Sequence, residues 1–163
     1  SEQVMQELIK ATIAMSKTKT GMLVVLERET GLKDYIESGI CLDSVVTSEL
    51  LINIFEPNTP LHDGATIIKE NRVAAAACFL PLSDNPYISM SLGTRHRAAI
   101  GLSEVCDALV LVVSEETGAI SVARDGKLVR SLEEKELRSI LEEALATKEP
   151  VHTPFWQRKG ANK

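Results

Sequence analysis

The sequence has few aromatic residues and no excess of positive charge. One tryptophan, two tyrosines and three phenylalanines among 163 residues leave few side chains on which a nucleic-acid base could stack. The formal net charge is −5, which argues against a protein that coats nucleic acid, because such binding depends on a broad basic surface. Any basic site must therefore be local.

Cysteines and long apolar runs are also scarce. Cys41, Cys78 and Cys106 are odd in number and widely spaced, so we expect reduced, largely buried thiols and a cytosolic compartment. No apolar run is long enough to cross a bilayer and no signal peptide is evident, so the chain as given is expected to be soluble. It opens on Ser-Glu-Gln without an initiator methionine, which is consistent with a fragment whose upstream part could hold an anchor.

The hydrophobic content of 44% is ample for a core, and the length fits one domain over residues 1–163, with a loose tail from about 150 onward. The apolar patterns predict helices and strands that alternate along the chain. The predicted helices cover 4–19, 32–38, a segment capped by Thr47 or Ser48 and ending at 55, 94–105, and a last helix that starts with a Ser131-Glu134 capping box; the predicted strands cover 22–26, 65–69, 72–80, 108–113, 119–123 and 128–129. This order predicts an α/β or α+β sandwich with a central mixed sheet flanked by helices.

A basic stretch, Gly93-Thr94-Arg95-His96-Arg97, is suited to holding phosphate. The glycine permits a turn, Thr94 can cap the helix, and the free N–H groups of its first turn favour an anion. A solvated charged helix start is the alternative, but two cations there oppose the helix dipole at a cost of up to about 1 kcal/mol each. Because Arg95 and Arg97 project about 200° apart, we expect Arg95, then His96, to bind phosphate and Arg97 to form a supporting salt bridge.

An acidic stretch lies upstream, where His62-Asp63-Gly64-Ala65 follows a proline turn. Alone, Asp63-Gly64 is more often a turn and His62 more often a structural histidine. The preceding proline and the following strand favour a site, because Gly64 and Ala65 let a ligand approach the backbone closely. The segment Ser114-Glu115-Glu116 follows a buried strand, where ligands of open α/β sheets bind, although a polar turn explains it equally well.

Asp63-Gly64-Ala65 and the basic stretch resemble the two signature motifs of the diadenylate cyclase domain, in the same order and about thirty residues apart. The similarity to the membrane-anchored bacterial type extends over essentially the whole chain. That family condenses two ATP into cyclic di-AMP, releases two pyrophosphates and requires Mn²⁺, Mg²⁺ or Co²⁺. The resemblance implies a face-to-face homodimer, in which each protomer holds one ATP and each ribose 3′-hydroxyl attacks the other nucleotide's α-phosphate.

The resemblance also implies roles for individual residues. Asp63 would activate the 3′-hydroxyl or help to hold the metal ion, for which His62 and Glu116 are the further candidate ligands. Catalysis would rest on Asp63, Arg95 and His96. The expected ATP-binding residues are Gly64 and Ala65 at the ribose, Gly93, Thr94, Arg95, His96, Arg97 and Ser114 at the phosphates, and Met22, Phe79 and Leu80 around the adenine.

The chain lacks the transmembrane helices of the anchored type and the DNA-binding region of the DNA-scanning type. It is therefore expected to be a catalytic fragment of a protein held at the cytoplasmic side of the bacterial membrane. A membrane-bound regulator protein and phosphoglucosamine mutase are the partners that the resemblance implies. Two alternatives remain: a module that senses ATP without turnover, and nucleic-acid binding through Arg95 and Arg97, which conflicts with the acidic balance.

Overall fold

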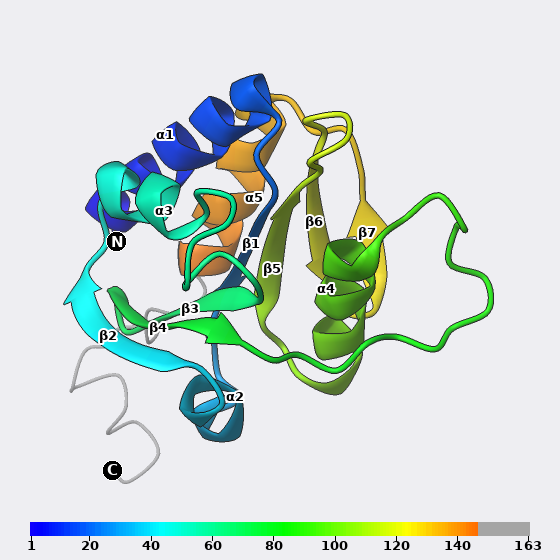
Figure 1. The fold of residues 1–163 in the computed structure, drawn as a ribbon, viewed down its shortest axis with the longest axis horizontal. Coiled ribbons are helices and arrows are strands. Elements are labelled where there is room, and N and C mark those ends of the chain that lie inside the picture. The colour runs from blue at the N-terminus through cyan, green and yellow to red at the C-terminus, as the bar shows by residue number, and fades with distance from the viewer. Residues whose placement is uncertain (147–163) are drawn as a thin grey trace, which may run out of the picture.

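A computed structural model describes residues 1–146, so the predicted loose tail lies outside the described residues. This part of the chain forms a seven-stranded sheet and five helices (Figure 1). The helices are α1 (Glu2–Thr18), α2 (Lys33–Glu37), α3 (Ser48–Ile54), α4 (Thr94–Val105) and α5 (Glu134–Ala146); the strands are β1 (Met22–Leu26), β2 (Ile40–Val45), β3 (Ala65–Lys69), β4 (Arg72–Cys78), β5 (Leu109–Val113), β6 (Ile120–Arg124) and β7 (Lys127–Val129). Within residues 1–146, no helix combines the length and apolarity that a bilayer crossing requires.

The sheet is mixed, with the order β2-β4-β3-β1-β5-β6-β7. The central strand β1 runs parallel to β3 and antiparallel to β5, and the other neighbouring strands are antiparallel. Helices α1, α3 and α5 cover one face and α2 and α4 the other, as Figure 1 shows. The predicted α/β fold with a central mixed sheet flanked by helices is therefore confirmed.

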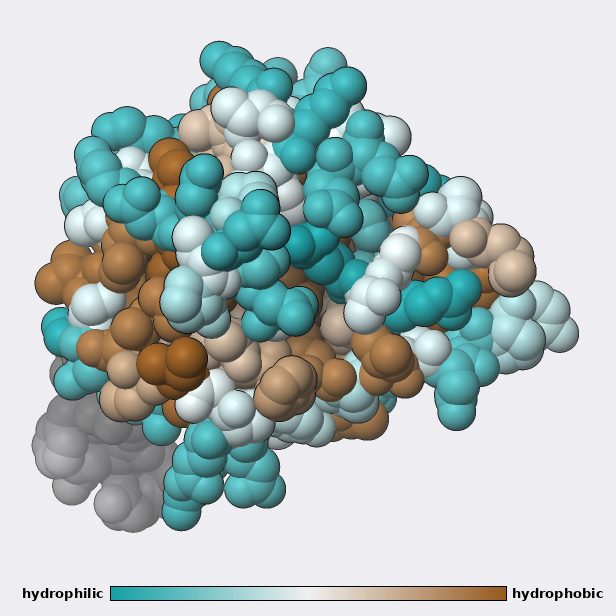
Figure 2. Space-filling view, in the orientation of Figure 1, coloured by the Kyte–Doolittle hydropathy of each residue, from teal (hydrophilic) through white to brown (hydrophobic). Residues whose placement is uncertain are grey.

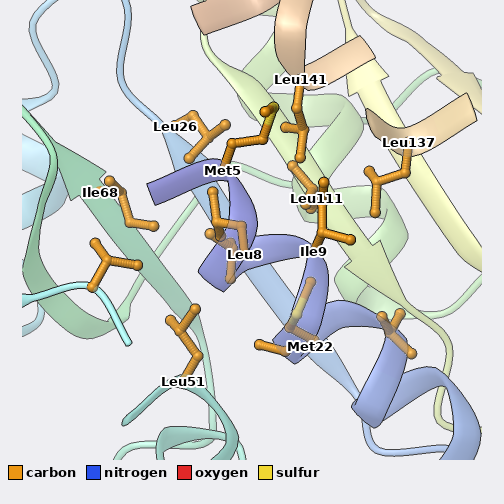
Figure 3. Close-up of a cluster of buried hydrophobic side chains, with 14 of the residues drawn as sticks. Met5, Leu8, Ile9, Met22, Leu26, Leu51, Ile68, Leu111, Leu137 and Leu141 are labelled. Carbon is orange, nitrogen blue, oxygen red and sulfur yellow. The ribbon is translucent and has the colours of Figure 1, made fainter. Parts of the chain in front are cut away.

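Both faces of the central strands are buried, which explains why β1 and β5 are continuous apolar runs rather than alternating ones. Along β1, Met22, Val24 and Leu26 pack toward α1 and α5, in the core drawn in Figure 3. Leu23 and Val25 pack toward α4. Neighbouring residues of β1 thus belong to different layers, and this alternation decides which of them can reach a site on the α4 face.

The edge strand β2 is absent from the sequence-based prediction because its residues are exposed or half-buried and lack an apolar run. It is irregular, since its pairing with β4 shifts register between Cys41 and Ser44 and Asp43 has a φ of 48°. The expectation of largely buried thiols is wrong for Cys41, which is exposed on this edge, whereas Cys78 is buried and Cys106 half-buried. All three thiols are free.

Of the three helix caps that the sequence predicts, one is confirmed and two are wrong. Thr47 caps α3, because its hydroxyl accepts a hydrogen bond from the Leu50 N–H at 3.1 Å. Gly93, not Thr94, is the N-cap of α4, and Thr94 is already helical. The predicted capping box of α5 is out of register: the helix begins at Glu134, and the Glu136 carboxylate accepts from the Glu133 N–H at 2.9 Å.

Candidate active site

A cavity of about 750 Å³ opens on the α4 face of the sheet. It lies at the ends of the central strands, where β1 and β3 begin and β4 and β5 end. Its size suits a small-molecule ligand. The cavity brings the acidic stretch before β3, the basic start of α4 and the turn after β5 into one site. The start of α4 and the turn after β5, some thirty and fifty residues beyond Asp63 in the sequence, thus lie with Asp63 around one cavity.

The acidic wall contains His62, Asp63 and Gly64. Gly64 has a φ of +111°, and a Cβ at this position would lie 2.7 Å from the carbonyl oxygen of Cys78. Only glycine fits there without strain. Because Gly64 has no side chain, the backbone beside Asp63 packs closely against the end of β4. Asp63 itself is exposed, so its carboxylate is accessible to a ligand in the cavity.

His62 is held by one ring nitrogen. Its Nδ1 lies 2.7 Å from the carbonyl oxygen of Thr59, which can only accept, so Nδ1 carries the proton in this contact. In the neutral ring Nε2 then has a free lone pair, as in histidines that ligate metals. However, no group of three His, Cys, Asp or Glu residues within the described chain could hold a metal ion. The predicted set of His62, Asp63 and Glu116 is therefore not assembled as a metal site.

The basic wall is the first turn of α4. Gly93, Thr94, Arg95 and His96 line the cavity, whereas Arg97 does not. This separation agrees with the helical geometry, which sends residues 95 and 97 to different sides. The predicted salt bridge of Arg97 is not formed with any described residue; instead its carbonyl accepts from the backbone N–H of Ser83 at 3.0 Å.

The turn between β5 and β6 forms a third wall. The Ser114 hydroxyl accepts from the N–H groups of Glu116 and Thr117, each at 3.2 Å, and so fixes the turn that presents Glu115 and Glu116 to the cavity. Glu115 forms an ion pair with Arg95, with 3.5 Å between carboxylate and guanidinium. The segment is thus a polar turn that also lines the cavity, so the two interpretations that the sequence left open do not exclude each other.

Arg130, which follows β7, also lines the cavity and was not predicted from the sequence. No local pattern marks it, since it is a single cation after a short strand. Burial lowers the pKa of His96 below its usual value of 6.5, and the positive charges of Arg130 and Arg95 lower it further. Burial and the two guanidiniums thus disfavour the charged form of the His96 imidazole.

The remaining wall is largely apolar and contains Leu23, Phe79, Leu80, Leu82 and Leu92. Met22 does not line it with its side chain, which is fully buried on the opposite face, where the Thr12 hydroxyl contacts its sulfur at 3.8 Å (Figure 3). The next residue, Leu23, lines the cavity instead of Met22, because successive side chains of a strand point to opposite faces of the sheet. Ala65 is fully buried and lies outside the lining as well. Burial raises the pKa of the Cys78 thiol in this wall to about 11.

The chain matches one known protein family over most of its length. The family described as "DisA bacterial checkpoint controller nucleotide-binding", abbreviated DAC, matches residues 9–128. The chain belongs to this family. The match includes the acidic stretch, the basic start of α4 and the turn after β5, but it ends before Arg130.

Curated members of the DAC family resemble the chain closely. It is 57% identical over 141 residues to "Cyclic di-AMP synthase CdaA" of Bacillus subtilis (strain 168), an alignment that covers 86% of this chain and 52% of that protein. It is 54% identical over 144 residues to "Diadenylate cyclase" of Listeria monocytogenes serotype 1/2a (strain 10403S), covering 88% of this chain and 53% of that protein. The chain thus spans about half the length of these curated relatives.

Solved structures agree with this fold. A double mutant of DacA from Staphylococcus aureus is 56% identical and superposes with a TM-score of 0.86, over 88% of this chain and 95% of that chain. A protein from Bacillus cereus described as a hypothetical membrane spanning protein is 46% identical with a TM-score of 0.76, over 78% of this chain and 63% of that chain. The DAC fold of this chain is therefore that of known crystal structures.

Proposed function

We propose that the chain is the catalytic domain of a diadenylate cyclase, which condenses two ATP into cyclic di-AMP and releases two pyrophosphates. The observation that carries the proposal is a single cavity in which an accessible carboxylate, Asp63, shares the walls with Arg95, His96 and Arg130. An acid that faces a cluster of phosphate-binding groups suits nucleotidyl transfer. The printed activities of the relatives at 54–57% identity support this assignment.

The reaction requires two identical substitutions at phosphorus. The 3′-hydroxyl oxygen of one nucleotide forms a bond to the α-phosphorus of the other, and the bond from that phosphorus to the pyrophosphate oxygen breaks. Asp63 accepts the hydroxyl proton, as an exposed carboxylate at the cavity wall can. The second substitution closes the ring in the same way and releases the second pyrophosphate.

The groups of the basic wall hold the phosphates and stabilise the charge that develops on them. Arg95 provides a planar fork for phosphate oxygens, and the first turn of α4, where backbone N–H groups have no partner within the helix, lines the same cavity. We assign Arg130 to the β- and γ-phosphates as a second cation, because it lines the cavity and forms no ion pair within the described residues. The adenine would lie against Leu23, Phe79 and Leu80.

The family implies metal-dependent catalysis, and two side chains of the cavity suit a divalent cation. His62 has a free Nε2 lone pair and Asp63 an accessible carboxylate, whereas a third protein ligand is missing among the described residues. These two residues would hold the ion together with phosphate oxygens, as Mg²⁺ is commonly held. The ion, whether Mn²⁺, Mg²⁺ or Co²⁺, would neutralise phosphate charge and favour departure of pyrophosphate.

A second copy of the chain is required by the symmetry of the reaction. One chain provides one Asp63 and one basic wall, whereas the product contains two identical new bonds, so two cavities face to face complete the site. The segment between β4 and α4 projects from the molecule (Figure 1) and exposes four large apolar side chains. They are Phe79, Leu82, Tyr87 and Met90. Figure 2 shows apolar and polar side chains together on the projecting side of the molecule.

We also propose that the domain belongs to a longer protein anchored at the cytoplasmic side of the membrane. The description of the Bacillus cereus relative as membrane spanning supports this placement. A membrane-bound regulator protein and phosphoglucosamine mutase are the proposed partners there. Pull-down from membranes with the anchored protein would test both partners.

The activity is tested by incubating the purified chain with ATP and Mn²⁺ and detecting the products by mass spectrometry. We expect cyclic di-AMP with two pyrophosphates per molecule, and a specific activity that rises with protein concentration because a dimer is required. ATP binding without pyrophosphate at any protein concentration would identify a nucleotide-sensing module instead. Failure to bind ATP would contradict both functions.

A further inference from the structure

We propose that Gly21, at the entry to β1, is a positioning residue for Arg95: its missing side chain leaves the space in which the guanidinium lies. This inference rests on the proposed function, in which Arg95 holds phosphate. Gly21 is not part of the cavity wall and lies outside both motifs. Any effect of Gly21 on the reaction is therefore expected to act through Arg95.

The contact geometry carries the inference. A Cβ at position 21 would overlap Cζ and Nη1 of Arg95 and lie 2.8 Å from its Nε. These are the three nearest atoms, and all of them belong to the guanidinium. The φ of Gly21 lies outside the left-handed region, so the backbone there does not itself require glycine. Glycine is needed at this position for space, and that space is filled by Arg95.

A second residue, Glu115, contacts the same guanidinium. The Glu115 carboxylate pairs with the Arg95 guanidinium at 3.5 Å. The turn that carries Glu115 is hydrogen-bonded to the end of α1. There the Ser16 hydroxyl donates to the Gly118 carbonyl at 2.6 Å, and the Gly118 N–H donates to the Ser114 carbonyl at 2.9 Å. The end of α1 is thus next to the turn in the chain's fold and to Gly21 in the sequence, and Arg95 contacts both Gly21 and Glu115 of that turn.

A methyl group at position 21 has a specific consequence. Because the obstructing atoms are the far end of a flexible side chain, the guanidinium can move away and the fold is retained. The moved guanidinium no longer occupies the place where it meets phosphate, and small displacements of such groups reduce rates strongly. Gly21→Ala is therefore expected to damage the site and to spare the stability.

The test is a double-mutant cycle of Gly21→Ala and Arg95→Ala, read on ATP affinity by calorimetry, on kcat and KM, and on the melting temperature. Gly31→Ala is the matched control, because a Cβ there meets nothing within 4 Å and its φ also lies outside the left-handed region. We expect Gly21→Ala to lower kcat/KM by about 10²-fold and to weaken ATP binding, with an unchanged melting temperature. In the Arg95→Ala background the same change should have no further effect on ATP affinity.

Each other outcome is decisive. If Gly21→Ala behaves like Gly31→Ala, or weakens ATP binding equally with and without Arg95, the inference is overturned. If Gly21→Ala does not fold, the double variant decides: folding at the melting temperature of Arg95→Ala supports the inference, and failure to fold overturns it. An inactive wild type would contradict the proposed function only, since the cycle is still read on ATP affinity.

Discussion

Arg95 and Glu115 form an ion pair in the wall of the cavity, with 3.5 Å between guanidinium and carboxylate. The side chain of Arg95 is 25% exposed and that of Glu115 is 66% exposed, so solvent weakens their attraction. The cation proposed to hold phosphate therefore has an acidic neighbour that a phosphate must outcompete.

Glu115→Gln removes that competition. We expect ATP to bind about two- to fivefold more tightly in the absence of divalent metal, since exposed ion pairs of this kind contribute up to about 1 kcal/mol. Calorimetry at low and moderate salt measures the effect, which should shrink as salt screens the pair. Unchanged or weaker binding at low salt would show that Glu115 does not compete with phosphate.

Asp63→Asn keeps the shape of the side chain and removes its ability to accept a proton. We expect the rate of cyclic di-AMP formation to fall by about 10²- to 10⁴-fold, the usual contribution of a general base. ATP binding should be largely retained, which equilibrium binding in the absence of turnover checks. Full activity of the variant would exclude Asp63 as the base.

Arg130→Ala tests the cation that the sequence did not reveal. Loss of a charge-assisted hydrogen bond to phosphate should weaken ATP binding by at least about tenfold. Lys127→Ala removes one positive charge from β7 without touching the cavity, and it should bind ATP like the wild type. Equal effects of the two variants would mean that Arg130 acts only through net charge.

The lowered pKa of His96 predicts a pH dependence of stability. The unfolded chain takes up a proton near pH 6.5 while the folded chain resists it, because burial, Arg130 and Arg95 disfavour the charged ring. The stability contributed by His96 is thus present above pH 6.5 and is lost as the pH falls through the lower folded pKa. Urea unfolding between pH 7 and about 5.5 should show a decline that His96→Gln reduces. Parallel curves for the two proteins would contradict the assignment.

The cysteines should differ in reactivity. Cys41 is exposed on β2, whereas burial raises the pKa of Cys78 to about 11 and keeps it a thiol at neutral pH. Iodoacetamide at pH 7.5, followed by peptide mass spectrometry, should modify Cys41 first, because the thiolate is the reactive form. Cys41→Ser should abolish the fast phase of labelling. Labelling of Cys78 at the rate of Cys41 would be inconsistent with this environment.

The parts of the fold that could be predicted are those whose signals are local. The apolar run of β1 and the spacing along α1 specify these elements directly, and the 3.6-residue period separates Arg95 from Arg97. The edge strand β2 gave no such signal, because an exposed strand with a bulge needs no apolar pattern. Alternation along β1 is local as well, but only the position of α4 tells that Leu23 and not Met22 faces the cavity.

The parts of the site that escaped prediction depend on distant segments. Arg130 reaches the cavity because the β6–β7 hairpin returns the chain to it, and no residue near position 130 in the sequence records this. The space that Gly21 leaves for Arg95 is likewise a contact between segments more than seventy residues apart. The motifs around Asp63 and Arg95, by contrast, contain their own turn and helix signals, which is why they were recognised.

The two edge strands of the sheet, β2 and β7, are poorly suited to pairing with a further strand. On one side, the irregularity of β2 between Cys41 and Ser44 interrupts the row of backbone donors and acceptors, and the charged Asp43 lies at this irregularity. On the other side, β7 offers only three residues. Irregular, charged or short edges discourage a neighbouring chain from docking by backbone pairing. The second copy that we propose would therefore dock on a surface other than the two edge strands, and we expect closed pairs rather than filaments built by strand addition.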